Sequence, residues 1–227
     1  MTMGIALLSL LTMAPLAWSG EETGTIAGTT RYVGDVPAAQ KIVASDGTVI
    51  IHNDIVVDEK SKGLRHVAAI LQGKFTPAKK RGPASIDQRD MLFVPRVIAV
   101  QEGDLVRFEN SDLCNHCVKA DGTRDENLFN IITPPGKSYE FRFKAQKSPV
   151  VIGCPIHGWM RAWVYVAPHP YLAVSDAQGR FRIENVPVGK HTLLLAHADT
   201  GFREEIAVEV EAGKTTELRR EWKTLKK

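Results

Sequence analysis

Residues 153–160 read Gly-Cys-Pro-Ile-His-Gly-Trp-Met, which is a Cys-x-x-His-x-x-Met run between two apolar stretches. The flanking residues 150–152 (Val-Val-Ile) and 163–166 (Trp-Val-Tyr-Val) are short and rich in β-branched and aromatic side chains, which is typical of β-strands. We therefore predict a strand, a compact loop and a second strand. The loop brings together a thiol, an imidazole and a thioether, which are donor groups for soft metal ions.

A second imidazole is needed to turn this loop into a copper site of the electron-transfer kind. Such a site has two imidazoles and one thiolate in a plane, with a weak axial thioether. The loop offers Cys154, His157 and Met160, and His116 is the natural second imidazole because it follows another strand-like segment. Beyond residue 20 the chain has two methionines, Met91 and Met160, and Met160 stands where the axial ligand belongs.

The composition fits a globular β-protein and excludes several other classes. The chain has 227 residues, of which 44% are hydrophobic and 24% charged, and its net charge of +3 does not indicate a nucleic-acid partner. No stretch keeps a helical period, and many short strands alternate with turns, so we predict an all-β fold. A phosphate-binding Gly-x-x-x-x-Gly-Lys loop and a His-x-His pair are both absent, so we do not expect an enzyme.

Taken together, these motifs resemble those of the cupredoxins, such as plastocyanin and amicyanin. More narrowly, the chain is similar to plastocyanin-like or methylamine-utilisation-type bacterial proteins. The resemblance implies a Greek-key β-sandwich over residues 21–167, with one type 1 copper held by His116, Cys154, His157 and Met160. It also implies a protein that carries single electrons between redox partners. The partner would dock briefly against an apolar face formed by Pro155, Gly158 and Trp159.

The two ends of the chain give further expectations. Residues 1–20 lack charged side chains and end in Ala-Trp-Ser-Gly, so we predict a signal peptide and a periplasmic or secreted protein with no membrane span after its removal. After a boundary near residues 168–170 (Pro-His-Pro), residues 168–227 resemble the carboxypeptidase-regulatory-like domain. That resemblance implies a small transthyretin-like β-sandwich without a catalytic set.

Two further cysteines leave the site chemistry open. Cupredoxins usually have Asn directly after the first ligand histidine, but this chain has Cys117 there, with Cys114 three residues earlier. The two cysteines could form a disulfide in an oxidising compartment, remain thiols, or bind metal. In the last case Cys114, Cys117, Cys154 and His157 form a Cys3His set suited to zinc. The alternative function is then a metal-stabilised binding or structural protein with a thiolate-rich zinc or copper-sequestering site.

Overall fold

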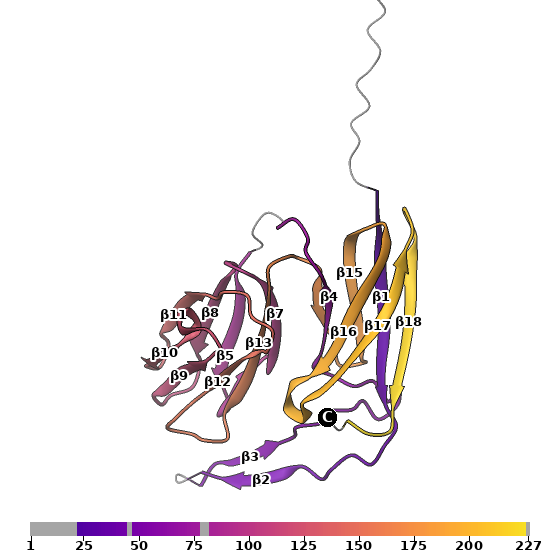
Figure 1. The fold of residues 1–227 in the computed structure, drawn as a ribbon. Coiled ribbons are helices and arrows are strands. Elements are labelled where there is room, and N and C mark those ends of the chain that lie inside the picture. Colours follow the sequence, from indigo (N-terminus) through magenta and orange to yellow (C-terminus); the bar gives the residue numbers. More distant parts are fainter. Residues whose placement is uncertain (1–21, 45–46, 78–81, 226–227) are drawn as a thin grey trace, which may run out of the picture.

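The chain folds into two β-sandwiches in the computed structural model, which describes residues 22–44, 47–77 and 82–225 (Figure 1). The all-β fold expected from the short strands is confirmed, since helical turns in the described residues are limited to two short 3-10 helices at Asp125–Asn127 and Ala198–Thr200. In this described part no helix is long and apolar enough to cross a membrane. The expected signal peptide lies outside the described residues.

The first sandwich is formed by residues 84–167. Its larger sheet has the strand order β10 (Phe129–Thr133), β9 (His116–Asp121), β12 (Val150–Gly153), β13 (Arg161–Ala167) and β7 (Val97–Gln101). Its smaller sheet has the order β11 (Ser138–Arg142), β8 (Leu105–Asn110), β5 (Ala84–Arg89) and β6 (Leu92–Val94). Inward-facing side chains of both sheets form one apolar core, among them Ile86, Phe108, Val118, Ile152 and Val164. This alternation of inward and outward residues is what the period of two in the sequence predicts.

The second sandwich combines the two ends of the described chain. One sheet has the order β14 (Leu172–Val174), β4 (Val67–Gln72), β16 (Gly189–His197) and β17 (Phe202–Val210). The other has the order β15 (Arg180–Pro187), β1 (Thr23–Tyr32) and β18 (Thr215–Trp222). Their shared core includes Ile26, Leu71, Phe181, Leu193 and Val210. A separate two-stranded ribbon is formed by β2 (Gln40–Val43) and β3 (Val49–His52).

The expected boundary between residues 167 and 168 does not divide the strands. Strands β1 and β4 belong to the expected unit 21–167, yet each is a central strand of the second sandwich. Strand β1 runs parallel to β18 and antiparallel to β15, and β4 lies between β14 and β16. Residues 168–227 alone would leave both sheets without their centre, so the second sandwich needs the N-terminal segment to close.

The two sandwiches are joined through a third apolar cluster. Its members come from β4, β14 and β16 on one side and from β7 and β13 on the other: Ala68, Ile70, Val97, Tyr165, Ala167, Leu172, Leu194 and Ala196. The outer face of the larger sheet of the first sandwich therefore packs against the second sandwich, and the four sheets form a row of layers (Figure 1). This packing leaves the loops at the ends of the strands exposed, which is where the candidate site lies.

Candidate metal centre

The loop between β12 and β13 gathers three of the expected ligands. Its backbone closes in successive turns, with the N–H of His157 donating to the carbonyl of Cys154 at 3.1 Å and the N–H of Met160 donating to that of His157 at 2.9 Å. The N–H of Cys154 donates to the carbonyl of Met160 at 3.2 Å and closes the loop. Cys154 and Met160 are buried in the core of the first sandwich, while His157 is partly exposed.

The fourth expected ligand, His116, begins strand β9 and is completely buried. The preceding loop is fixed by Asn110, whose side-chain amide donates to the carbonyls of Cys114 at 2.9 Å and Thr133 at 2.7 Å. A buried polar group that makes two such bonds stabilises one loop conformation. Asn110 thus braces the ligand loop in a chain that has Cys117 at the position where an asparagine was expected.

Three donor atoms converge at the end of the sandwich. The Nδ1 atoms of His116 and His157 lie 2.9 Å apart, and the Sγ of Cys154 lies 4.0 Å from the first and 3.7 Å from the second. Ions of the size of zinc bind nitrogen at about 2.0 Å and sulfur at about 2.3 Å, so donor atoms at these separations fit around one ion. Met160 is packed in the same core cluster as Cys154. The three converging donors are two imidazoles and a thiol, which is chemistry that suits copper.

Hydrogen bonds from neighbouring residues orient the donor atoms of His116 and Cys154. Asp112 lies four residues before His116, and its Oδ2 is 2.9 Å from the Nε2 of that histidine. A carboxylate that accepts the proton of one ring nitrogen leaves the other as a metal ligand, here Nδ1. The backbone N–H of Cys117 donates to the Sγ of Cys154 at 3.3 Å. Because this bond uses the backbone, it does not depend on which side chain stands at position 117.

The same contacts change the protonation of the donors. Burial raises the pKa of the Cys154 thiol, but hydrogen bonds from His116 and from three backbone N–H groups outweigh burial and bring that pKa below its usual value. Burial lowers the pKa of His116, but hydrogen bonds to Cys154 and Asp112 outweigh it, and that pKa lies above its usual value. The thiolate is the form that binds metal, so the environment prepares Cys154 for ligation.

The other two cysteines are not joined to each other. All three cysteines are thiols in the structure, so the disulfide between Cys114 and Cys117 that the sequence left open is not formed. Cys117 is buried in the core of the first sandwich, where burial raises the pKa of its thiol. Cys114 is exposed in the preceding loop, with its Sγ 3.8 Å from the Sδ of Met91 and 3.6 Å from the Nε2 of His116. The two thiols therefore face different surroundings.

Met91 and Cys114 extend the site beyond the four expected ligands. Cys114, His116 and His157 each offer a ligand atom within 4.8 Å of the others. Sequence reasoning considered Cys114 as an extra ligand but gave Met91 no role. The only sequence signal for Met91 was that it is one of two methionines beyond residue 20. Its approach depends on the hairpin between β5 and β6, which a linear pattern does not place beside residue 114.

The residues expected in a docking face surround the partly exposed His157. Pro155 and Gly158 are exposed, whereas Trp159 is partly buried and its indole N–H donates to the carbonyl of Met91 at 3.1 Å. The ring of Trp159 lies 5.3 Å from that of His157, measured between centroids. The indole therefore supports the loop in addition to contributing surface.

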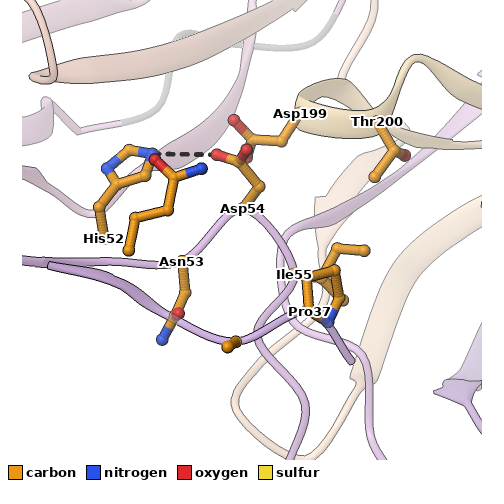
Figure 2. A pocket seen from close by; sticks show the side chains of 9 residues that line it. Pro37, His52, Asn53, Asp54, Ile55, Asp199 and Thr200 are labelled. Atoms are coloured by element: carbon orange, nitrogen blue, oxygen red, sulfur yellow. Dashed lines mark hydrogen bonds and ion pairs between the residues drawn. The ribbon is translucent and has the colours of Figure 1, made fainter. Parts of the chain in front are cut away.

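A second cluster of histidines and acids lies where β3 meets the second sandwich. A pocket of about 170 Å³ is lined there by His52, Asp54 and Asp199, and Figure 2 shows the Nε2 of His52 directed at the carboxylate of Asp54, 3.0 Å away. Arg96 donates to Asp199 at 2.6 and 2.9 Å and to Asp54 at 2.8 Å, and the indole of Trp163 also donates to Asp199. This cluster contains no sulfur and ties the two sandwiches together.

No known protein family matches the chain, and no curated protein matches it. Among solved structures it is similar to a copper-containing nitrite reductase from Thermus scotoductus, with 20% identity over 42% of this chain and 25% of that chain and a TM-score of 0.35. It is also similar to a purple cupredoxin from Nitrosopumilus maritimus, with 20% identity over 37% of this chain and 99% of that chain and a TM-score of 0.32. It is also similar to a reduced Cu(I) form of an amicyanin variant, with 21% identity over 43% of this chain and 97% of that chain and a TM-score of 0.34. The match thus spans a quarter of the nitrite reductase.

Proposed function

We propose that this chain is a type 1 copper protein that carries single electrons between redox partners in the periplasm or outside the cell, and that it is not an enzyme. The observation that carries the proposal is the convergence of three donor atoms: the Nδ1 atoms of His116 and His157 and the Sγ of Cys154, all within 4.0 Å of one another. Met160, buried in the same core cluster as Cys154, would supply the thioether ligand.

Copper bound there would supply a centre that cycles between Cu(I) and Cu(II). The residues of the chain hold the ligands in fixed positions. The packed core and the backbone turns hold Cys154 and Met160 in place, and Asp112 and Asn110 hold His116 and its loop. Ligands that move little between two oxidation states keep the reorganisation small, which favours fast electron transfer.

His157 is the proposed exit route for the electron. It is the one of the four proposed ligands that is not buried. The neighbouring Pro155 and Gly158 are exposed, and Ile156 is 53% exposed, so a partner protein can approach the ring across a mostly apolar surface. Leu113, in the loop before His116, is a further exposed apolar residue at 98% exposure. A small apolar contact of this kind suits brief docking of a redox partner.

The zinc alternative requires the Cys117 thiol among the ligands. That thiol is buried in the core cluster, and burial raises its pKa, which opposes the thiolate that zinc requires. Its backbone N–H already donates to Cys154. We therefore favour copper held by His116, Cys154 and His157 over a Cys3His zinc set.

The test is the visible absorption of the purified chain after loading with Cu(II). We expect an intense charge-transfer band that disappears with ascorbate and is absent in Cys154→Ser. Cys117→Ala should keep the band, because position 117 contributes a backbone N–H. A colourless copper-loaded protein, or a band that survives in Cys154→Ser, would refute the proposal. Loss of the band in Cys117→Ala, with zinc retained by the wild-type protein, would support the zinc alternative instead.

A further inference from the structure

We propose that Met91 and Cys114 form a second, outer binding site for Cu(I), on the side of His116 that faces away from Cys154. The Sγ of Cys114 lies 3.8 Å from the Sδ of Met91. Cys114 is exposed and Met91 is partly exposed, so the pair can be reached from solvent. Thiolate and thioether together select Cu(I) over harder ions such as magnesium or calcium.

The spacing of the two sulfur atoms suits one shared ion. Metal–sulfur bonds of about 2.3 Å to two atoms at this separation give an angle of roughly 110° at the ion, between tetrahedral and trigonal. The Nε2 of His116 is 3.6 Å from the Sγ of Cys114 and gives its proton to Asp112, so it borders the pair, and the two sulfur atoms are the proposed ligands. On binding, the Cys114 thiol loses its proton to solvent and the thiolate sulfur bonds to Cu(I), without any change of oxidation state.

The chain holds Met91 in place at a conformational cost. Asp90 and Met91 form the turn between β5 and β6 and have φ values of 53° and 60°. For a long side chain such as that of Met91 this left-handed conformation is unfavourable. Three hydrogen bonds maintain it: the carboxylate of Asp112 accepts the N–H groups of Asp90 at 2.8 Å and Met91 at 3.0 Å, and the indole of Trp159 donates to the Met91 carbonyl at 3.1 Å.

The imidazole of His116 borders both the outer site and the inner one. His116 presents Nδ1 to His157 and Cys154, and Nε2 to Asp112 and Cys114. Asp112 both orients this ring and seats Met91, so the two sites share one support. The role we assign to the outer site is the first capture of Cu(I) from solvent before transfer inward. This role rests on the proposed function, whereas the binding of a soft ion by the two sulfur atoms does not.

The experiment counts Cu(I) ions bound by the full apo-chain. The chain is titrated without oxygen against a colorimetric Cu(I) chelator, and the stoichiometry is read by native mass spectrometry. We expect two ions per wild-type chain and one in Cys114→Ser. Met91→Leu, which keeps the volume of the side chain, should bind the second ion about tenfold more weakly or worse.

Cys154→Ser separates the two proposals. It should lose the inner site and still bind one Cu(I) at Met91 and Cys114, so the outer site can be confirmed even if no blue colour is ever found. A Cys154→Ser chain that binds no Cu(I) would overturn the inference. So would a Met91→Leu chain that binds two ions as tightly as the wild type, because an exposed thiol would then act without its thioether neighbour.

Discussion

Buried histidines occur at the candidate metal centre of the first sandwich and in the second sandwich beside the junction, and they behave in opposite ways. At the metal centre, Asp112 and Cys154 hydrogen-bond to His116 and raise its pKa in spite of burial. At the junction with the second sandwich, burial dominates and lowers the pKa of His66 to about 3 and that of His197 as well. Within the described residues, the Nδ1 of His66 and the Nε2 of His197 have no hydrogen-bond partner. Burial alone therefore does not mark a ligand; a paired donor set does.

The carboxylates of these two regions also have different partners. At the junction, the side chain of Asp199 is 2% exposed. Arg96 neutralises its charge, so this carboxylate forms an ion pair with Arg96 and the nearby histidines remain neutral. Burial raises the pKa of Asp199, but hydrogen bonds and the charge of Arg96 outweigh burial and lower it. At the metal centre, Asp112 is directed at a histidine and at backbone N–H groups. The first arrangement fastens two sandwiches, and the second prepares a ligand.

The largest effect is expected when the junction loses its cation. Arg96→Met leaves the Asp199 carboxylate buried, with the indole N–H of Trp163 still donating to it, and breaking a buried pair in this way costs about 3–5 kcal/mol. Urea unfolding followed by tryptophan fluorescence measures the loss. Arg107→Met is the matched control, because Arg107 pairs with Glu140 on the exposed surface, where such pairs contribute about 0.2–1 kcal/mol. Equal losses in the two variants would contradict the prediction.

The second-largest effect is expected from acid, which should lower the free energy of unfolding through a histidine at the junction. His66 has a folded pKa of about 3, below the model-peptide value of 6.5, so below pH 6.5 the unfolded chain binds a proton that the folded chain refuses. The free energy of unfolding therefore falls with acidification, by up to about 1.4 kcal/mol per pH unit for this residue. The stabilisation is fully present above pH 6.5 and is lost as the pH approaches 3. Unfolding of the apo-chain at pH 6.5 and 4.5 measures this slope.

Two variants test whether the histidine at the junction or the one at the candidate metal centre causes this dependence of the unfolding free energy on pH. His66→Asn should make it shallower, and Asn suits the φ of 71° at this position. His116→Asn should not, because a raised pKa has the opposite sign: its contribution is present below pH 6.5 and is lost as the pH rises through the folded pKa. An unchanged slope in His66→Asn would show that another group carries the acid sensitivity.

The sequence predicted the part of the site that is local. Cys154, His157 and Met160 lie in one short loop, so their spacing already places them together, and His116 follows from the need for a second imidazole. Whether Cys114 and Cys117 could form a disulfide depends on where strand β9 begins. It begins at His116, so Cys117 is a core residue of the strand and Cys114 stays in the loop.

The parts that the sequence did not predict depend on long-range pairing. Strand β1 reads as an ordinary alternating strand, and nothing in its own residues indicates that it pairs with β18 at the other end of the chain. Met91 reaches the site from the smaller sheet through the turn formed by Asp90 and Met91. Both residues have positive φ values, but neither is a glycine, so the sequence does not indicate this turn. A pattern within one segment fixes which face of that strand is buried, but not which other segment covers it.

The smallest effect concerns the carboxylate that distinguishes the two histidine environments. Asp112→Asn removes the charge beside the Nε2 of His116 and keeps an oxygen of similar position, so the ring should remain a ligand with weaker support. Loss of such a partner typically lowers metal affinity by about 10- to 100-fold. The measurement is a copper titration against a competing chelator at constant pH. The variant should keep the shape of its absorption band, because the ligands themselves are unchanged.

Asp121→Asn, at the far end of β9 from His116, supplies the control. Asp121 pairs with Lys119 on the exposed side of β9, about 46% and 53% exposed for the lysine and the aspartate, and it should leave the affinity unchanged. If Asp112→Asn behaves in the same way, then the carboxylate of Asp112 does not contribute to metal binding by His116. The contrast with His66 would then rest on the sulfur atom, since a buried imidazole beside a thiol would be prepared for metal without help from an acid.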